Sequence, residues 1–152
     1  MESIKTVALS GPTLLGPILG SVRANITANP ISQERLKYTV VLVLCDGTIN
    51  DVDVAISEIV ELSHLPVSII IIGVGAADFT DMHALDGDGQ KLSSRGKSAV
   101  RDIVQFVPFR DFVSQSSTAL TKAVLAEVPG QVLEFMAWAK FTPNSPPPPY
   151  SG

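Results

Sequence analysis

Two nearly continuous apolar runs stand out along the chain, at residues 38–44 and 67–72. Strands that are buried on both faces read as such runs, and they are typical of parallel sheets covered by helices. Between the runs, residues 52–63 carry apolar side chains at helical spacing, and Asn50 or Asp51 is placed to cap this helix. Strand, helix and strand predict a βαβ unit with a right-handed crossover. The pattern therefore predicts an α/β fold with a parallel sheet.

Weaker patterns predict further elements on both sides of this unit. Apolar residues at steps of three and four indicate a helix over 14–26, with Pro17 in its first turn, where proline is tolerated. After the second run we expect a helical turn at 80–85, a short helix around 97–101 and a third strand at 103–107.

The last third of the sequence predicts helices. Ser116 or Ser117 is placed to cap a helix, and Pro129 interrupts the helical pattern. Residues 131–140 then form a separate segment, in which we expect three buried side chains, those of Leu133, Met136 and Trp138.

Composition fits one domain with a well-filled core. The chain has 152 residues, of which 45% are hydrophobic, and its net charge of −4 disfavours nucleic acid as a partner. Cys45 is the only cysteine, and the sequence shows neither a signal peptide nor a membrane-spanning run, which favours a cytosolic setting. We expect one domain over residues 1–141 and a disordered proline-rich tail over 142–152.

Three strands make a small sheet for so apolar a chain. An apolar strand at a sheet edge invites further pairing, so burial alone indicates part of a larger doubly wound domain. Open parallel sheets bind ligands beyond the carboxyl ends of their strands. Asp46 directly follows the first apolar run and is therefore a candidate binding residue.

Six segments, in this order, resemble the C-terminal part of the copine family. They are residues 9–13, 38–53, 65–81, 85–89, 101–110 and 123–129. The block Arg-Asp-Ile-Val-Gln-Phe-Val-Pro-Phe-Arg at 101–110 is the most specific of them, and the resemblance extends over residues 9–140.

This resemblance implies a von Willebrand A-like domain that recruits protein partners. In the family, a metal site lies at the carboxyl ends of the strands and uses an Asp-x-Ser-x-Ser loop, a threonine and an aspartate. Thr13 and Asp46 match the last two, whereas the sequence contains no Asp-x-Ser-x-Ser pattern. We therefore expect a partial, mostly parallel doubly wound sheet with flanking helices, whose first strands are missing, and an incomplete site for Mg or Ca.

Copines also carry two C2 domains that bind membrane phospholipid when calcium rises. The sequence shows no C2 domain, so we do not expect this chain to bind lipid by itself. The resemblance implies a cytoplasmic protein that is recruited peripherally to the plasma membrane.

Other interpretations of these residues stay open. Thr13 could cap a helix and Asp46 could be a turn residue. The Gly73-Val74-Gly75 stretch lacks the third glycine of a dinucleotide loop, and Asp78 would oppose a phosphate. Asp88-Gly89 fails as the centre of a calcium loop because the flanking ligand positions hold no suitable side chain.

The prediction for function is a non-enzymatic interaction module. Partners would dock at the carboxyl ends of the strands, around Thr13, Asp46, Gly47 and Asp78. The alternative is a small flavodoxin-like or nucleotide-binding α/β enzyme, for which a phosphate loop or a convergent acid–base pair would be needed.

The tail offers a second, independent contact. Pro147, Pro148 and Tyr150 fit the Pro-Pro-x-Tyr pattern that WW domains recognise in polyproline II segments. We expect a WW-domain protein as a candidate partner of the tail.

Overall fold

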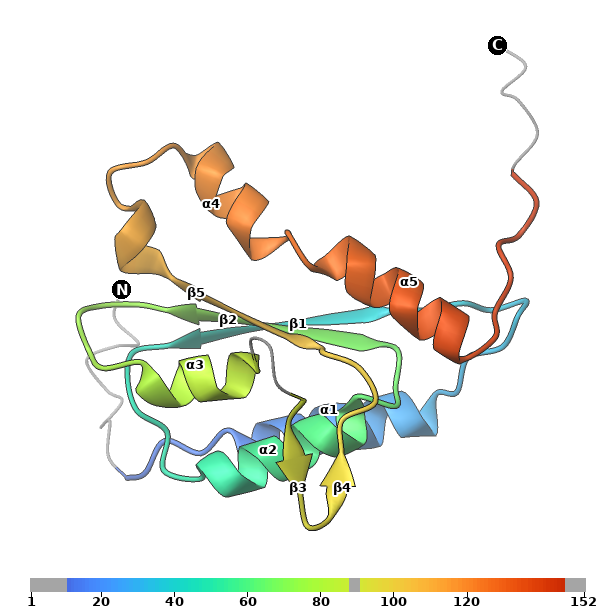
Figure 1. The fold of residues 1–152 in the computed structure, drawn as a ribbon, viewed down its shortest axis with the longest axis horizontal. Coiled ribbons are helices and arrows are strands. Elements are labelled where there is room, and N and C mark those ends of the chain that lie inside the picture. The colour runs from blue at the N-terminus through green and yellow to red at the C-terminus, as the bar shows by residue number, and fades with distance from the viewer. Residues whose placement is uncertain (1–10, 88–90, 147–152) are drawn as a thin grey trace, which may run out of the picture.

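A parallel three-stranded sheet forms the centre of the molecule (Figure 1). The computed structural model describes residues 11–87 and 91–146. The strands β1 (Thr39–Cys45), β2 (Val67–Gly73) and β5 (Val104–Pro108) lie in the order β1-β2-β5, with both pairs parallel. The parallel sheet and the positions of its three strands are therefore confirmed.

Helices cover both faces of this sheet, as expected for a doubly wound fold. Figure 1 shows the first three helices below the sheet and the last two above it. They are α1 (Gly16–Ala28), α2 (Val52–Leu62), α3 (Thr80–Asp86), α4 (Ser117–Val124) and α5 (Val128–Trp138), with the 3₁₀ turn η2 (Phe109–Phe112) after β5. The architecture is that of a partial von Willebrand A-like fold, as the sequence predicted.

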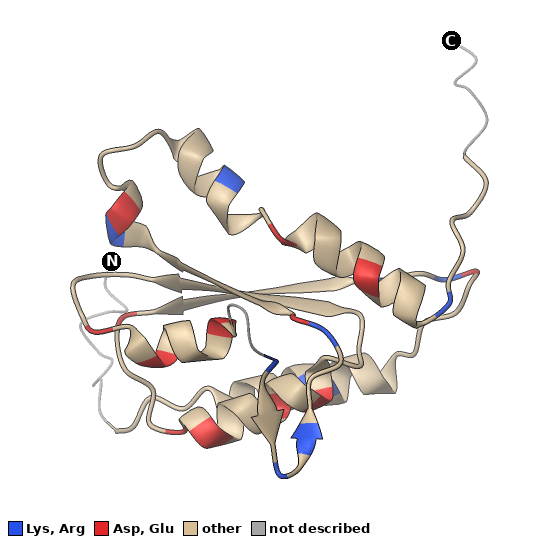
Figure 2. Ribbon diagram, in the orientation of Figure 1, with Lys and Arg blue, Asp and Glu red and all other residues tan. Residues whose placement is uncertain are grey.

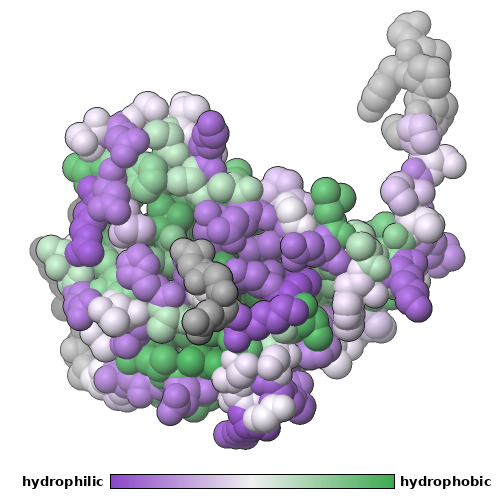
Figure 3. All heavy atoms as spheres, viewed as in Figure 1, coloured by the Kyte–Doolittle hydropathy of each residue, from purple (hydrophilic) through white to green (hydrophobic). Residues whose placement is uncertain are grey.

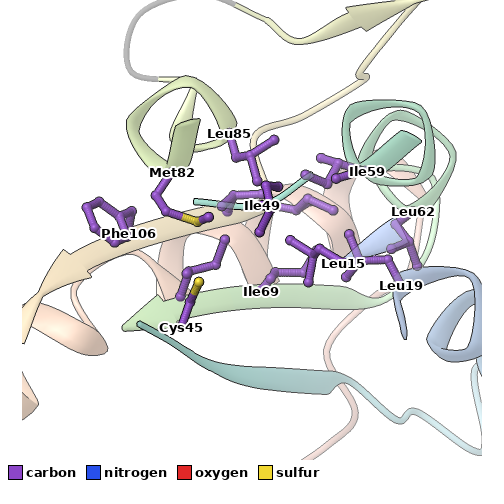
Figure 4. Close-up of a cluster of buried hydrophobic side chains, with 14 of the residues drawn as sticks. Leu15, Leu19, Cys45, Ile49, Ile59, Leu62, Ile69, Met82, Leu85 and Phe106 are labelled. Atoms are coloured by element: carbon purple, nitrogen blue, oxygen red, sulfur yellow. The ribbon is translucent and has the colours of Figure 1, made fainter. Parts of the chain in front are cut away.

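The main core lies between the sheet and the lower helical layer (Figure 4). Strand β2 is buried along almost its whole length, because it has a strand on each side and helices on both faces. Strand β1 is different: Val40, Leu42 and Leu44 are 47%, 58% and 68% exposed. Burial on both faces is thus correct for β2 and wrong for β1, because β1 lies at the sheet edge and one of its faces has little cover.

The region predicted as a short helix at 97–101 is instead a β-hairpin. Strands β3 (Ser93–Ser94) and β4 (Lys97–Ser98) pair in antiparallel fashion. The two residues between them, Arg95 and Gly96, have φ values of +51° and +78°. Two consecutive positive φ values are the geometry of a two-residue hairpin turn, for which the glycine is well suited.

The predicted burial pattern of the last helix is also wrong. Pro129 lies in the first turn of α5, so it starts this helix instead of interrupting one. The buried side chains are those of Gln131 and Phe135. Of the three predicted to be buried, Leu133 is 70% and Trp138 49% exposed, and Met136 is half-buried. Figure 3 shows hydrophobic surface over α4 and α5.

The first residues beyond the predicted domain boundary contact the body of the protein. The Thr142 N–H donates to the side chain of Gln33, and Gln33 Nε2 donates to the carbonyl of Thr142 and to Asn144 Oδ1. The proposed WW-binding residues, Pro147, Pro148 and Tyr150, lie outside the described residues.

A buried arginine joins the segments at the amino end of the sheet. Arg101 is only 5% exposed, and its guanidinium lies against the rings of Tyr38 and Phe135. It donates hydrogen bonds to the carbonyls of Leu65, Val67 and Gln131 and to the hydroxyl of Tyr38. Desolvation lowers the pKa of Arg101, which indicates that the buried charge is costly. The sequence marked this block as specific but did not indicate its structural role.

Candidate functional site

The carboxyl ends of the three strands meet at one edge of the sheet. Cys45 pairs with Gly73, and Gly73 pairs with Pro108 on its other side. The segments that follow the strands, residues 46–51, 74–79 and 109–112, therefore emerge together. We call these three segments the rim.

Contacts between its segments hold the rim in place. The Val74 N–H donates to the Cys45 carbonyl at 2.8 Å. Gly47 lies close to the second segment, because a Cβ added at Gly47 would be 3.4 Å from the Cβ of Ala77. Arg110 donates from Nη1 to the Ala77 carbonyl at 3.0 Å. The rim is thus connected across all three strands.

Thr13 lies beside the first rim segment. Its N–H donates to Asn50 Oδ1 at 2.8 Å, and the Asn50 N–H donates to the Thr13 carbonyl at 2.8 Å. Asp46 belongs to the same rim segment as Asn50, and both Thr13 and Asp46 are exposed. The fold therefore associates Thr13 with the loop that carries Asp46, although no hydrogen bond joins these two residues in the described part of the chain.

Asp51 performs a role that the sequence did not reveal. Asn50 or Asp51 was expected to cap α2, but the Asp51 carboxylate makes no such bond. Instead Oδ1 accepts from the Leu15 N–H at 2.9 Å and Oδ2 from the Gly16 N–H at 2.8 Å. The N-terminus of α1 is thereby capped from the rim, so Thr13 is not its cap. No local pattern could predict a cap supplied from 35 residues away.

The donor set of the rim is small for a metal ion. No group of three or more His, Cys, Asp or Glu side chains comes together among residues 11–87 and 91–146. Thr13 and Asp46 offer one hydroxyl and one carboxylate, whereas magnesium requires six oxygen ligands. Because Asp51 is occupied by the α1 N-terminus, it is not available as a third ligand. These residues do not by themselves fit a metal site.

Acidic side chains are prominent at this edge of the sheet (Figure 2). Asp46 and Asp78, which follow β1 and β2, are both exposed. Asp78 Oδ1 accepts from the Thr80 hydroxyl at 2.6 Å and from the Thr80 N–H at 3.0 Å, so it holds the start of α3. These hydrogen bonds lower the pKa of Asp78, chiefly the one from the Thr80 hydroxyl.

Replacing Thr80 by alanine should raise the pKa of Asp78 toward its ordinary value, because the hydroxyl donor is lost while the backbone donor remains. A carboxyl-carbon NMR titration measures this directly. The depressed pKa stabilises the folded state above the ordinary pKa of aspartate, and this contribution is lost as the pH falls through the folded-state pKa. An unchanged Asp78 titration in Thr80→Ala would show that the hydroxyl bond does not persist in solution.

The two histidines and the cysteine, all of which lie in the described ranges, do not converge on the rim as a catalytic group. His64 packs edge-on against Trp138, and His83 packs edge-on against Phe106. The buried thiol of Cys45 donates to the Gly47 carbonyl at 3.0 Å. These contacts are those of structural residues.

Two loops with suggestive sequences have structural roles where the structure describes them. Gly75 turns the chain with a φ of +96°, and α3 begins only at Thr80. A helix N-terminus does not therefore follow β2 directly, as a dinucleotide loop requires. Asp86 Oδ1 accepts from the Phe106 N–H at 2.7 Å, and Gly87 ends α3 in the left-handed conformation; residues 88 and 89 lie outside the described part.

Comparison with known protein families gives one match that spans almost the whole chain. The family model described as Copine matches residues 1–144.

Proposed function

The chain belongs to the copine family, and on this premise we propose that it is a non-enzymatic interaction module that docks protein partners on the rim. The main observation in favour of this proposal is that contacts link the three segments of the rim. Gly47 lies close to Ala77 and Arg110 donates to the Ala77 carbonyl, so that contacts span the three strands while Asp46 and Asp78 stay exposed. A surface that is ordered before binding loses less conformational entropy on association, which favours docking.

Site-specific photo-crosslinking tests this proposal. A photoreactive amino acid at Thr48, an exposed rim position, should give discrete crosslinked products in cell extract, whereas the same group at Ala24, exposed on α1, should not. The double variant Asp46→Asn/Asp78→Asn should reduce the Thr48 products by about fivefold or more, since charged contacts contribute to docking. Equal products at both positions, or products that ignore the double variant, would contradict docking on the rim.

We further propose that Thr13 and Asp46 hold Mg or Ca only when a partner supplies the remaining oxygens. This follows from the small donor set of the rim and from the occupation of Asp51. Calorimetry on the isolated chain should show no magnesium or calcium binding tighter than about 1 mM. Micromolar binding that Asp46→Ala abolishes would show that the chain already holds a complete site.

The tail proposal is separate from the rim. The Pro147, Pro148 and Tyr150 motif would bind a WW domain, a class of domain that recognises Pro-Pro-x-Tyr segments in the polyproline II conformation. Fluorescence anisotropy with a panel of WW domains should detect at least one complex that Tyr150→Ala abolishes. No binding across the panel would remove this partner class.

The proposed setting is cytoplasmic, with peripheral recruitment to the plasma membrane through other parts of a copine or through partners. No helix in the described ranges combines the length and apolar character that crossing a membrane would require. Co-sedimentation with phosphatidylserine vesicles and calcium should leave the isolated chain in the supernatant.

The alternative function, a small flavodoxin-like or nucleotide-binding enzyme, would instead be favoured by a large thermal shift with a nucleotide or flavin.

A further inference from the structure

The β3–β4 hairpin carries an exposed serine in a basic setting. It projects below the helical layer (Figure 1), with basic side chains at its tip and on β4 (Figure 2). Arg95, Lys97 and Ser98 are all exposed, and Arg95 stands three residues before Ser98. No other arginine of the chain has a serine or threonine three residues after it. Many protein kinases select their substrates by the charge pattern around the acceptor, so this pattern indicates Ser98 as an acceptor.

The hydroxyl of Ser98 is held only by a short hairpin. It forms a hydrogen bond of 2.8 Å with the Ser93 hydroxyl on the opposite strand. The two strands have two residues each, and the Ala99 N–H donates to the Leu92 carbonyl at 2.8 Å where the hairpin joins the body. A hairpin of this size opens at small cost, because few interactions are lost when it does. Opening presents residues 93–98 as an extended segment.

One ion pair attaches the hairpin to α2. Lys97 Nζ donates to Glu61 Oε1 at 2.6 Å, and the two side chains are 65% and 40% exposed. So exposed a pair contributes little to stability, and another anion can replace either partner. The hydrogen bond from Lys97 is the main reason that the pKa of Glu61 lies below its ordinary value. The titration of Glu61 therefore reports whether the hairpin is attached.

The hydroxyl of Ser98 opens on a cavity that charged side chains surround. The cavity has a volume of about 470 Å³, and its lining includes Arg23, Glu61, His64, Lys97 and Ser98. Arg23 is already fixed by two hydrogen bonds to Glu58, of 2.7 and 3.3 Å. The Lys97 ammonium, in contrast, bonds among the described residues only to the exposed Glu61. Because Lys97 also directly precedes Ser98, it is the cation that a phosphate on Ser98 would recruit most easily.

We propose that Ser98 is a phosphorylation site for a kinase that selects basic segments, and that the phosphate draws Lys97 from Glu61 and so releases the hairpin from α2. In the reaction the Ser98 oxygen attacks the γ-phosphorus of ATP, and the new O–P bond replaces the bond from that phosphorus to the bridging oxygen. ADP leaves, and the hydroxyl proton passes to a base of the kinase. The product carries a charge of about −1.5 to −2 at pH 7, which attracts Lys97 and repels Glu61.

Phosphorylation of the folded full chain tests the first part. The kinase is one that selects serine three residues after an arginine, ATP and magnesium are supplied, and tandem mass spectrometry locates the phosphate. Ser98 should be modified, and Arg95→Gln should lower the initial rate by about tenfold or more, as the loss of a charged contact predicts. The matched control is Arg35→Gln, also at an exposed position, which should keep the native rate.

A synthetic peptide of residues 91–101 shows whether the fold permits the reaction. Modification of this peptide but not of the folded chain would overturn the proposal, because the hairpin would then not open to the kinase. Failure to modify either one, with a kinase that is active on its own reference peptide, would show that Arg95 does not direct it to Ser98. An equal rate in Arg95→Gln would also contradict the proposal.

The titration of Glu61 in the phosphorylated full chain tests the second part. Its pKa, followed by carboxyl-carbon NMR, should rise, because Glu61 loses its hydrogen-bond donor and gains a nearby negative charge. Exchange of the Ala99 amide should become faster by about tenfold or more as the hairpin loosens. Ser98→Ala, treated with the same kinase, should show neither change.

Lys97→Gln separates release of the hairpin from simple repulsion. The pKa of Glu61 should already be raised in this variant before modification, and phosphorylation should then raise it by less than in the native chain. An equal rise in both proteins would mean that the phosphate does not recruit Lys97. Unchanged Glu61 titration and unchanged Ala99 exchange in the phosphorylated native chain would overturn the release. These measurements concern the hairpin and are independent of crosslinking at Thr48 on the rim.

Discussion

Replacing Arg101 by methionine should lower the free energy of unfolding by about 2–4 kcal/mol, because the change removes several charged hydrogen bonds to buried acceptors. The Val67 carbonyl accepts from Arg101 at 2.8 Å, and the carbonyls of Leu65 and Gln131 also accept from it. The Val67 carbonyl keeps the Tyr38 hydroxyl as a donor and the Leu65 carbonyl keeps the Val67 N–H, so the cost is that of losing charged hydrogen bonds, about 1.5–3 kcal/mol each. Removal of a desolvated charge returns part of this cost, so we expect less than the full sum.

Urea unfolding followed by circular dichroism measures the effect of Arg101→Met. The control is Arg35→Met, at an exposed position, which should change the stability by less than about 0.5 kcal/mol. Arg101→Lys should fall between the two, since one ammonium group cannot reach acceptors that the planar guanidinium bonds simultaneously. A loss below about 1 kcal/mol in Arg101→Met would show that the cost of burying the cation nearly cancels its hydrogen bonds.

Gly16→Ala should destabilise the protein by about 2–3 kcal/mol, although alanine ordinarily stabilises a helix by about 1 kcal/mol relative to glycine. Gly16 is the first residue of α1 and lies against the next helix. A Cβ at this position would be 2.5 Å from Val54 Cγ1 and 2.8 Å from Asp51 Oδ2. The methyl group would therefore separate α1 from α2 and displace the carboxylate that caps α1.

Gly20→Ala, four residues further along the same helix, is the matched control. Its Cβ would be no closer than 3.7 Å to any atom beyond its immediate helical surroundings, the nearest being in the side chain of Glu58. This substitution should stabilise the protein by about 0.5–1 kcal/mol, because only the helical preference changes. Opposite signs for the two alanine variants, measured by thermal or urea unfolding, are the expected result.

A double-mutant cycle separates overpacking from loss of the cap. Asp51→Ala alone should cost about 1–2 kcal/mol. If Gly16→Ala acts partly by displacing the Asp51 carboxylate, the double variant should cost less than the sum of the two single variants. Strict additivity would mean that α1 shifts without losing its cap.

The sequence predicted the strands of the parallel sheet. It did not predict the hairpin, the inward face of the last helix or the cap that joins the rim to α1. The strands near 38–44 and 67–72 were evident because a nearly unbroken apolar run has few other structural explanations. The exposure of Val40, Leu42 and Leu44 was not evident, since a run buried on both faces and a run at a sheet edge look alike in sequence. Burial of a strand depends on its neighbours, which lie elsewhere in the chain.

The errors in the later elements share a cause. The hairpin at 93–98 depends on two positive φ values at Arg95 and Gly96, and a single glycine after an arginine is a weak signal for such a turn. In α5 the apolar residues are spread around the helix, so periodicity alone could not show that Phe135 faces inward and Leu133 outward. Packing partners, which the sequence does not specify locally, decide between such alternatives.

At the rim, the family resemblance was a better guide to which segments lie together than the local sequence pattern was. The resemblance associated Thr13 with the loop that carries Asp46, and the two hydrogen bonds between Thr13 and Asn50 support this association. The carboxylate with the clearest structural function, Asp51, was one of two candidates for the cap of α2 and instead caps α1, which was missed because helix caps are normally sought within a few residues. The roles of Thr13 and Asp46 in binding remain predictions that the proposed calorimetry and crosslinking test.

The edge-on contact between His64 and Trp138 gives this protein a built-in optical reporter. Trp138 is the only tryptophan of the chain, and it lies in the last turn of α5, with its ring centroid 5.8 Å from that of His64 at the end of α2. Its emission therefore reports on one event, the seating of the last helix on the rest of the molecule. Separation of α5 would change the indole spectrum before the strands come apart, so fluorescence and circular dichroism together distinguish local undocking from global unfolding without any added label.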